Sequence, residues 1–131
     1  MIKQLNQVEI FHRLIGQKFG KVPHIPNEEA MELRFKLFNE EVIEWSDGCV
    51  DNDLPNVAKE LADILYIWCG AVLECGCADI IEEVFDAVHE SNMSKLDDKG
   101  LPIFREDGKL LKGPNYEKAN IESIIYKPLN D

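Results

Sequence analysis

Apolar side chains recur at helical spacing through the first three-quarters of this sequence, and this periodicity restricts the chain to a mainly helical fold. A short amphipathic segment over residues 5–15 ends at Gly16, and Asn27 can cap the start of a longer helix that runs to about residue 47. Residues 48–53 have the composition of a polar turn. The pattern then predicts two more helices, from residue 54 or 56 to 74 and from 78 or 79 to 93.

The spacing of apolar residues changes after Ser94. Residues 101–105 and 109–111 flank Asp107-Gly108, a dipeptide suited to the type I′ turn of a β-hairpin. We therefore expect an all-α fold, in which an antiparallel four-helix bundle over about residues 4–95 precedes a short C-terminal β-hairpin and tail over about 96–131. No repeat or linker interrupts the sequence, so a single domain over residues 1–131 is expected.

The charge balance narrows the classes of function. The chain has 14 basic and 25 acidic residues among 131 and a formal net charge of −11, so its field would repel a nucleic acid. A small phosphorylated ligand is not excluded if a divalent cation accompanies it. No apolar run approaches the ~18 residues of a membrane span, and the N-terminus lacks a signal-peptide pattern. The four cysteines show no CxxC or zinc spacing, so a reduced, cytoplasmic protein is expected.

Four carboxylates fall on the core-facing side of two consecutive predicted helices. In the first helix, Glu41 lies within the apolar arc and Glu44 lies at its edge. In the second, Glu60 lies within the apolar face and Asp63 lies at its margin. The sequence therefore predicts two inward carboxylate pairs, each with i,i+3 spacing.

Such pairs are costly unless something neutralises them. Two like charges ~4 Å apart repel by about 4 kcal/mol even at an effective dielectric near 20, and desolvation adds to this cost. The predicted helices offer few inward basic residues, of which Arg34 is the clearest. A divalent cation resolves the problem, and oxygen ligands without His or Cys favour Mg²⁺, with Mn²⁺ as a substitute. The alternative is that the acids form a solvated face, but two pairs on adjacent helices favour the cation.

The order of these acids resembles a known signature. Glu40-Glu41-Val42-Ile43-Glu44, followed after 15 residues by Glu60-Leu61-Ala62-Asp63, is similar to the EExxE and ExxD motifs of the all-α nucleoside triphosphate pyrophosphohydrolases. These include the MazG-like and phosphoribosyl-ATP pyrophosphohydrolase-like proteins. Segments over 12–26, 91–96, 105–109 and 111–116 also resemble parts of these proteins, so the resemblance covers nearly the whole chain.

The resemblance implies a Mg²⁺-dependent enzyme that cleaves a nucleoside triphosphate between its α and β phosphates, giving the monophosphate and pyrophosphate. By motif position, the metal ligands would be Glu41, Glu44, Glu60 and Asp63, and Glu40 would orient or deprotonate the attacking water. Some relatives with a similar tail resemble dUTP-preferring enzymes, which suggests a pyrimidine deoxynucleotide. The resemblance also implies a homodimer or homotetramer.

Four further residues are candidates for substrate contact, each with an ordinary structural alternative. Asn92 could hydrogen-bond the nucleotide and Lys95 could contact a phosphate, or the two could belong to a helix C-terminus. Lys112 could reach a phosphate or could be an exposed surface lysine. His12 occupies a position that resembles the nucleotide side of the family, or it is a structural histidine.

Two other functions compete with the nucleotide enzyme. A di-iron carboxylate bundle needs two ExxH units, but the only similar pair, Asp86 and His89, falls opposite the apolar face of its helix. A non-catalytic acidic helical interaction module would explain the negative charge but not the inward carboxylates. Metal-dependent release of pyrophosphate distinguishes the enzyme from the module.

Overall fold

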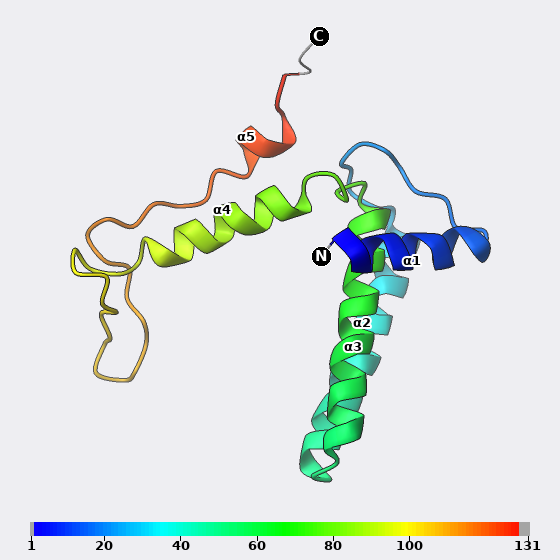
Figure 1. Ribbon diagram of the computed structural model, residues 1–131, viewed down its shortest axis with the longest axis horizontal. Coiled ribbons are helices and arrows are strands. Elements are labelled where there is room, and N and C mark those ends of the chain that lie inside the picture. Colours follow the sequence, from blue (N-terminus) through cyan, green and yellow to red (C-terminus); the bar gives the residue numbers. More distant parts are fainter. Residues whose placement is uncertain (1, 129–131) are drawn as a thin grey trace. The chain divides into compact units, whose positions relative to one another are not determined.

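The chain folds into helices joined by irregular segments (Figure 1). The computed structural model describes residues 2–128. These contain four long helices and a short one, namely α1 (Ile2–Leu14), α2 (Glu28–Val50), α3 (Leu54–Glu74), α4 (Ile81–Met93) and α5 (Glu122–Ile125). Within that range there is no strand, so the prediction of an all-helical fold is confirmed and the prediction of a β-hairpin is wrong.

The chain divides into two compact units, Met1–Asp79 and Ile80–Asp131. The first unit contains α1, α2 and α3, whereas α4 and α5 belong to the second. Among the described residues, neither unit by itself contains the predicted four-helix bundle, although the four long helices are those predicted. The prediction that residues 1–131 act as one domain stays a prediction.

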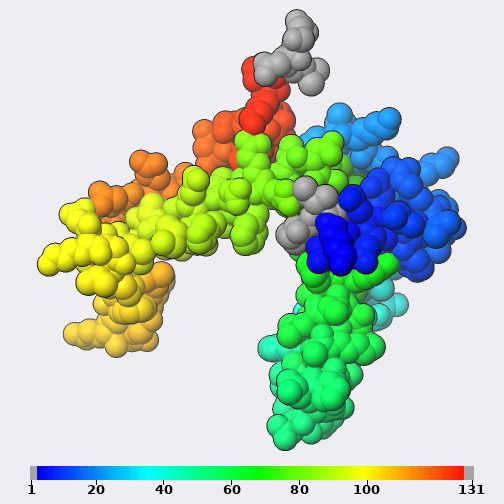
Figure 2. Space-filling view, in the orientation of Figure 1, coloured from blue at the N-terminus to red at the C-terminus, as the bar shows by residue number. Residues whose placement is uncertain are grey.

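In the first unit, α3 contacts both α2 and α1. The short connection between α2 and α3 makes them an antiparallel pair, and Figure 2 shows their side chains as one continuous column. The core lies where α1 meets the C-terminal half of α3, and its buried side chains are Leu5, Val8, Cys69, Val72 and Leu73. Gly70 allows a close approach here, because a Cβ at this position would lie 2.5 Å from Nη1 of Arg34.

The start of α2 follows the prediction, but its end does not. The side chain of Asn27 caps the helix, with Oδ1 accepting a hydrogen bond of 2.8 Å from the backbone N–H of Ala30. The helix then continues through Gly48 to Val50, so the predicted turn over 48–53 begins three residues too early. Gly48 is buried in the helix contact, because a Cβ there would lie only 3.2 Å from the side chain of Val57. This packing retains the glycine in the helix.

Much of the apolar side of α2 is not covered within the first unit. Six large apolar side chains between its first and fifth turns are each at least 37% exposed, namely Met31, Leu33, Phe35, Val42, Ile43 and Trp45. An apolar group of this size is unusual for a unit that packs against nothing else.

The predicted hairpin is a turn with only one isolated antiparallel bridge, between Phe104 and Leu110. The turn is a three-residue loop, in which Gly108 has a φ of 86° and Asp107 does not have the positive φ that a type I′ turn requires. The N–H of Leu111 still donates to the backbone oxygen of Ile103 at 2.8 Å. Pairing ends there, because the N–H of Gly113 donates to the backbone oxygen of Lys95 at 2.8 Å and not to residue 101.

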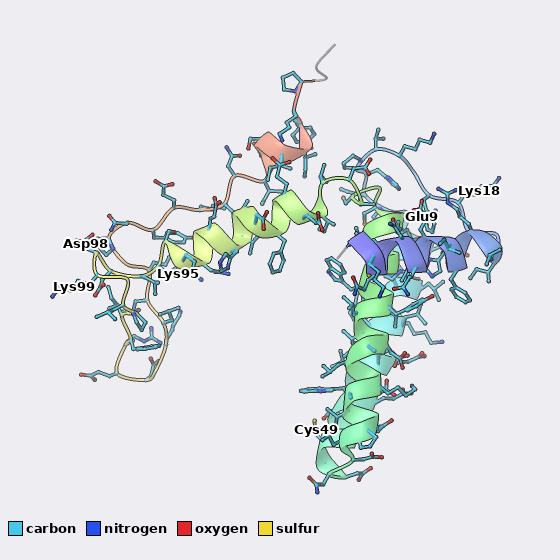
Figure 3. All side chains as sticks on the ribbon, in the orientation of Figure 1. Glu9, Lys18, Cys49, Lys95, Asp98 and Lys99 are labelled. Carbon is cyan, nitrogen blue, oxygen red and sulfur yellow. The ribbon has the colours of Figure 1, made fainter. Side chains whose placement is uncertain are left out.

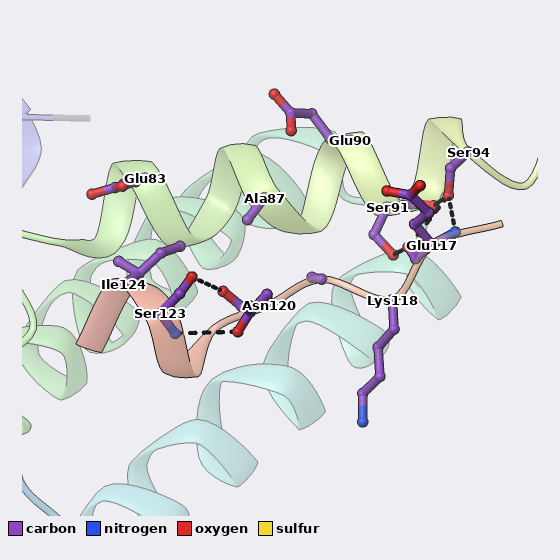
Figure 4. A pocket seen from close by; sticks show the side chains of 11 residues that line it. Glu83, Ala87, Glu90, Ser91, Ser94, Glu117, Lys118, Asn120, Ser123 and Ile124 are labelled. Atoms are coloured by element: carbon purple, nitrogen blue, oxygen red, sulfur yellow. Dashed lines mark hydrogen bonds between the residues drawn. The ribbon is translucent and has the colours of Figure 1, made fainter. Parts of the chain in front are cut away.

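In the second unit, hydrogen bonds hold the segment that precedes α5 against α4. The hydroxyl of Ser91 donates to the backbone oxygen of Glu117 at 2.8 Å, and the N–H of Glu117 donates to the Ser94 hydroxyl at 2.9 Å. Between this segment and α4 lies a pocket of about 440 Å³ (Figure 4). Ile124 of α5 is buried and closes part of it.

None of the helices within residues 2–128 combines the length and the apolar character that crossing a membrane requires.

Candidate metal centre

Carboxylates from two helices converge in the first unit. Because α2 and α3 run antiparallel around a turn centred on Asn52, residues at equal distances from that turn lie beside each other. Glu41 lies eleven residues before Asn52, and Asp63 lies eleven after it. One carboxylate oxygen from each of Glu41, Glu60 and Asp63 lies within 4.8 Å of the others. We call these three residues the carboxylate cluster.

The cluster is partly removed from solvent. The side chain of Glu60 is only 3% exposed, and that of Asp63 is 38% exposed. The Oε2 atoms of Glu41 and Glu60 are buried and have no hydrogen-bond partner. A buried carboxylate oxygen without a donor is unfavourable, so these two atoms call for a proton or a cation.

The proximity of these carboxylates also shifts the pKa values of Glu41 and Glu60. A hydrogen bond from protonated Glu41 to Glu60 raises the pKa of Glu41 to about 7, and desolvation and the charges of Glu44 and Asp63 act in the same direction. The pKa of Glu60 is lowered, because Glu41 and then Lys59 stabilise its carboxylate by hydrogen bonds. The two glutamates therefore share one proton below neutral pH and carry a full negative charge each above it.

A basic residue that the sequence analysis missed lies at the cluster. Lys59 Nζ lies 3.0 Å from Oε1 of Glu60 and 2.6 Å from Oδ2 of Asp63. The i,i+4 spacing of Lys59 and Asp63 is visible in the sequence and was the available signal. Arg34, which the sequence singled out, instead pairs with Glu74, with Nη2 3.0 Å from Oε2.

The residues present fit a hard divalent cation. The three ligand atoms are all oxygens, the type that Mg²⁺ and Mn²⁺ prefer, and two unpartnered buried oxygens lie in the same group. Their spacing is compatible with several ligands around one centre. The chemistry of the donors, rather than any bound ion, therefore assigns this position as the candidate metal centre.

The other two acids of the predicted motif are not members of the cluster. Glu44 is exposed and is not among the three that meet within 4.8 Å, yet its charge raises the pKa of Glu41. Glu40 is also exposed. Its proposed role toward water stays a prediction.

His12 lies elsewhere in the first unit. It is 7% exposed and contacts aromatic rings, with centroids 5.8 Å away in Phe11 and Phe19 and 6.4 Å away in Tyr66. Burial lowers its pKa, and the charge of Arg34 adds to this. A Cβ at Gly70 would lie 2.9 Å from the imidazole, and Gly70 is ten residues beyond Glu60, about 15 Å along α3. The structure therefore places His12, a residue of α1, in the core beside α3 and apart from the cluster.

The remaining substrate candidates belong to the second unit. Lys95 donates to Oδ1 of Asn92 at 2.9 Å, so the two predicted residues contact each other at the end of α4, where Figure 3 labels Lys95. Nζ of Lys112 lies 4.7 Å from the centroid of the Tyr116 ring, which is a cation–π contact. Their role toward a nucleotide stays a prediction.

A known protein family matches the part of the chain that contains the cluster. The sequence model of a family described as phosphoribosyl-ATP pyrophosphohydrolase matches residues 8–92. This span includes the whole of α2 and α3, and hence all four predicted metal ligands. Among curated proteins, none matches the chain.

Proposed function

The chain belongs to the phosphoribosyl-ATP pyrophosphohydrolase family, within the MazG-like all-α nucleoside triphosphate pyrophosphohydrolase superfamily, and from this we propose that it is a Mg²⁺-dependent nucleoside triphosphate pyrophosphohydrolase. The family supports pyrophosphohydrolase activity on nucleotides. The observation that carries the rest is the convergence of Glu41, Glu60 and Asp63, with buried oxygens that have no donor.

In the proposed reaction, water attacks the α phosphorus of the nucleotide, and the bond to the bridging oxygen breaks to release pyrophosphate and the monophosphate. Glu41, Glu60 and Asp63 would hold the cation from α2 and α3, with Glu44 as the fourth ligand. Mg²⁺ in this position would neutralise phosphate oxygens and align the reacting groups. Glu40, an exposed acid that precedes Glu41 in the chain, would accept the proton of the attacking water.

The proposed substrate is a pyrimidine deoxynucleoside triphosphate such as dUTP. We further propose that Asn92, Lys95 and Lys112 supply contacts to the nucleotide. The alternative substrate is the one in the description of the family, phosphoribosyl-ATP. Both contain an α–β phosphoanhydride, so a panel that includes both separates the two within one assay.

We also propose that the active protein is a homodimer or homotetramer. The six exposed apolar side chains of α2 support this, because their burial against a second copy would be favourable. Sedimentation at micromolar concentration should therefore give a multiple of 15.0 kDa. A mass equal to one chain would overturn the oligomer.

The experiment that tests the function is pyrophosphate release from a panel of nucleoside triphosphates and phosphoribosyl-ATP, with and without Mg²⁺. We expect Mg²⁺-dependent release that is lost in Glu41→Gln and Asp63→Asn, with the helical circular dichroism unchanged. Glu32→Gln is the matched control, because Glu32 is an exposed acid on α2 outside the cluster. Full activity in both cluster variants would overturn the site, and no release from any substrate would favour a non-catalytic interaction module.

A further inference from the structure

Lys59 differs from an ordinary surface lysine in what it contacts. Its ammonium lies 3.0 Å from a carboxylate oxygen of Glu60 and 2.6 Å from one of Asp63, two of the three members of the carboxylate cluster. Within residues 2–128 it is the only basic side chain that forms an ion pair with the cluster. The lysine therefore compensates part of the negative charge that the three acids bring together.

The two ends of this contact have opposite environments. The side chain of Lys59 is 64% exposed, whereas that of Glu60 is only 3% exposed. Lys59 thus approaches the buried carboxylate from the solvent side on a flexible four-carbon stem. It can leave without opening a cavity, because little of the lysine is packed against the protein. By contrast, Glu60 cannot move to solvent without disturbing α2 and α3.

A divalent cation and the Lys59 ammonium would compete for the same atoms. The lysine contacts Oε1 of Glu60 and Oδ2 of Asp63, and a cation held by the cluster would draw on these residues too. Two positive groups on the same oxygens repel each other strongly at such separations. The exposed and flexible partner is the one that can withdraw.

We propose that Lys59 is a displaceable counter-ion of the carboxylate cluster, which neutralises Glu60 and Asp63 while no divalent cation is bound and leaves them when one binds. This proposal rests on the proposed function, because it takes the cluster as the metal centre. If Lys59 must be displaced, half-saturation of the cluster requires a higher metal concentration than it would without the lysine charge. Lys59 thus lowers the metal affinity and stabilises the metal-free fold.

The first test is Mg²⁺ titration by calorimetry, without nucleotide, of the full chain and three variants. Lys59→Met retains the stem and removes the charge, so we expect tighter Mg²⁺ binding by roughly two- to fivefold, the size of an exposed ion-pair effect. Lys59→Arg retains a competing cation and should bind close to the unsubstituted protein. Lys18→Met is the matched control, because Lys18 is an exposed lysine in the loop after α1 (Figure 3).

Equal Mg²⁺ affinity in the unsubstituted protein, Lys59→Met and Lys18→Met would overturn the role of Lys59 and leave the metal centre intact. Weaker binding in Lys59→Met would also overturn it, because the lysine would then assist the cation. Absence of Mg²⁺ and Mn²⁺ binding in every protein would overturn the metal centre itself, and the Lys59 proposal with it. The two failures are therefore distinguishable.

A second measurement uses the unsubstituted protein and does not depend on how the variants fold. The ammonium group of Lys59 is followed by ¹H–¹⁵N NMR during Mg²⁺ addition, with the Lys59→Arg spectrum giving the assignment. We expect the Lys59 signal to shift and to lose its slow-exchange character as the ion pairs break, while the Lys18 signal remains unchanged. A Lys59 signal that does not change at saturating Mg²⁺ would overturn displacement.

Discussion

The affinity of the cluster for Mg²⁺ should depend on pH in a way that one side chain controls. Glu41 has a pKa of about 7, raised mainly by its hydrogen bond to Glu60. Below this pH it carries a proton, and a carboxylate must lose its proton to bind a cation. Binding should therefore release close to one proton at pH 6 and almost none at pH 8.

The size of the effect follows from the fraction of Glu41 that is ionised. With a pKa of about 7, this fraction is roughly 0.1 at pH 6 and roughly 0.9 at pH 8. The association constant for Mg²⁺ should therefore rise about tenfold over this range and then level off. The folded, metal-free protein should behave in the opposite sense. Because the pKa of Glu41 is raised on folding, its contribution to stability is present below pH ~4.5 and is lost as the pH rises through 7.

Calorimetric Mg²⁺ titrations at pH 6, 7 and 8, in two buffers of different ionisation enthalpy, measure both the affinity and the protons released. Glu41→Gln is the matched variant, since it retains the shape of the side chain and removes the ionisation. We expect this variant to bind Mg²⁺ weakly and with little dependence on pH. An affinity in the unsubstituted protein that is constant from pH 6 to 8 would refute the reasoning, as would an equal pH dependence in Glu41→Gln.

Three further predictions concern stability. Mg²⁺ at 100 times its dissociation constant should stabilise the fold by about 2.7 kcal/mol, seen as a higher melting temperature, and an unchanged melting temperature would contradict the site. Asn27→Ala removes the α2 cap and should lower the free energy of unfolding in urea by about 1 kcal/mol. The exposed control Asn39→Ala should lower it by less than 0.5 kcal/mol, roughly the range for surface changes. Equal losses in the two variants would argue against the cap. Gly70→Ala should cost about 1–3 kcal/mol, because its Cβ would lie 2.5 Å from Arg34 and 2.9 Å from His12, and unfolding at an unchanged urea concentration would show that the contact relaxes.

Local signals in the sequence located most of the helices. The apolar spacing predicted a helix from residue 54 or 56 to 74, and α3 spans Leu54–Glu74. Asn27 was identified as the α2 cap because capping depends on a side chain and the first turn alone. Gly48 was misassigned because its helical state depends on contact with Val57 of α3, which no local pattern contains.

The carboxylates of the candidate site were predictable because helix periodicity determines the side of a helix on which each residue lies. Glu41, Glu60 and Asp63 were placed on facing sides of two helices, and the structure brings one oxygen of each within 4.8 Å of the others. The helix periodicity does not indicate Lys59, because this lysine is not on the inward face and contacts the cluster from the solvent side. The short pairing around Gly108 depends on where Gly113 donates its hydrogen bond, which again is a tertiary contact.

The most direct measurement is a crystal structure of the protein grown with Mn²⁺, with anomalous data collected at the manganese absorption edge. The account predicts an anomalous peak coordinated by oxygens of Glu41, Glu60 and Asp63, with the Lys59 ammonium withdrawn from it. Fully occupied manganese elsewhere, with these three carboxylates still joined only to Lys59 and to one another, would contradict it.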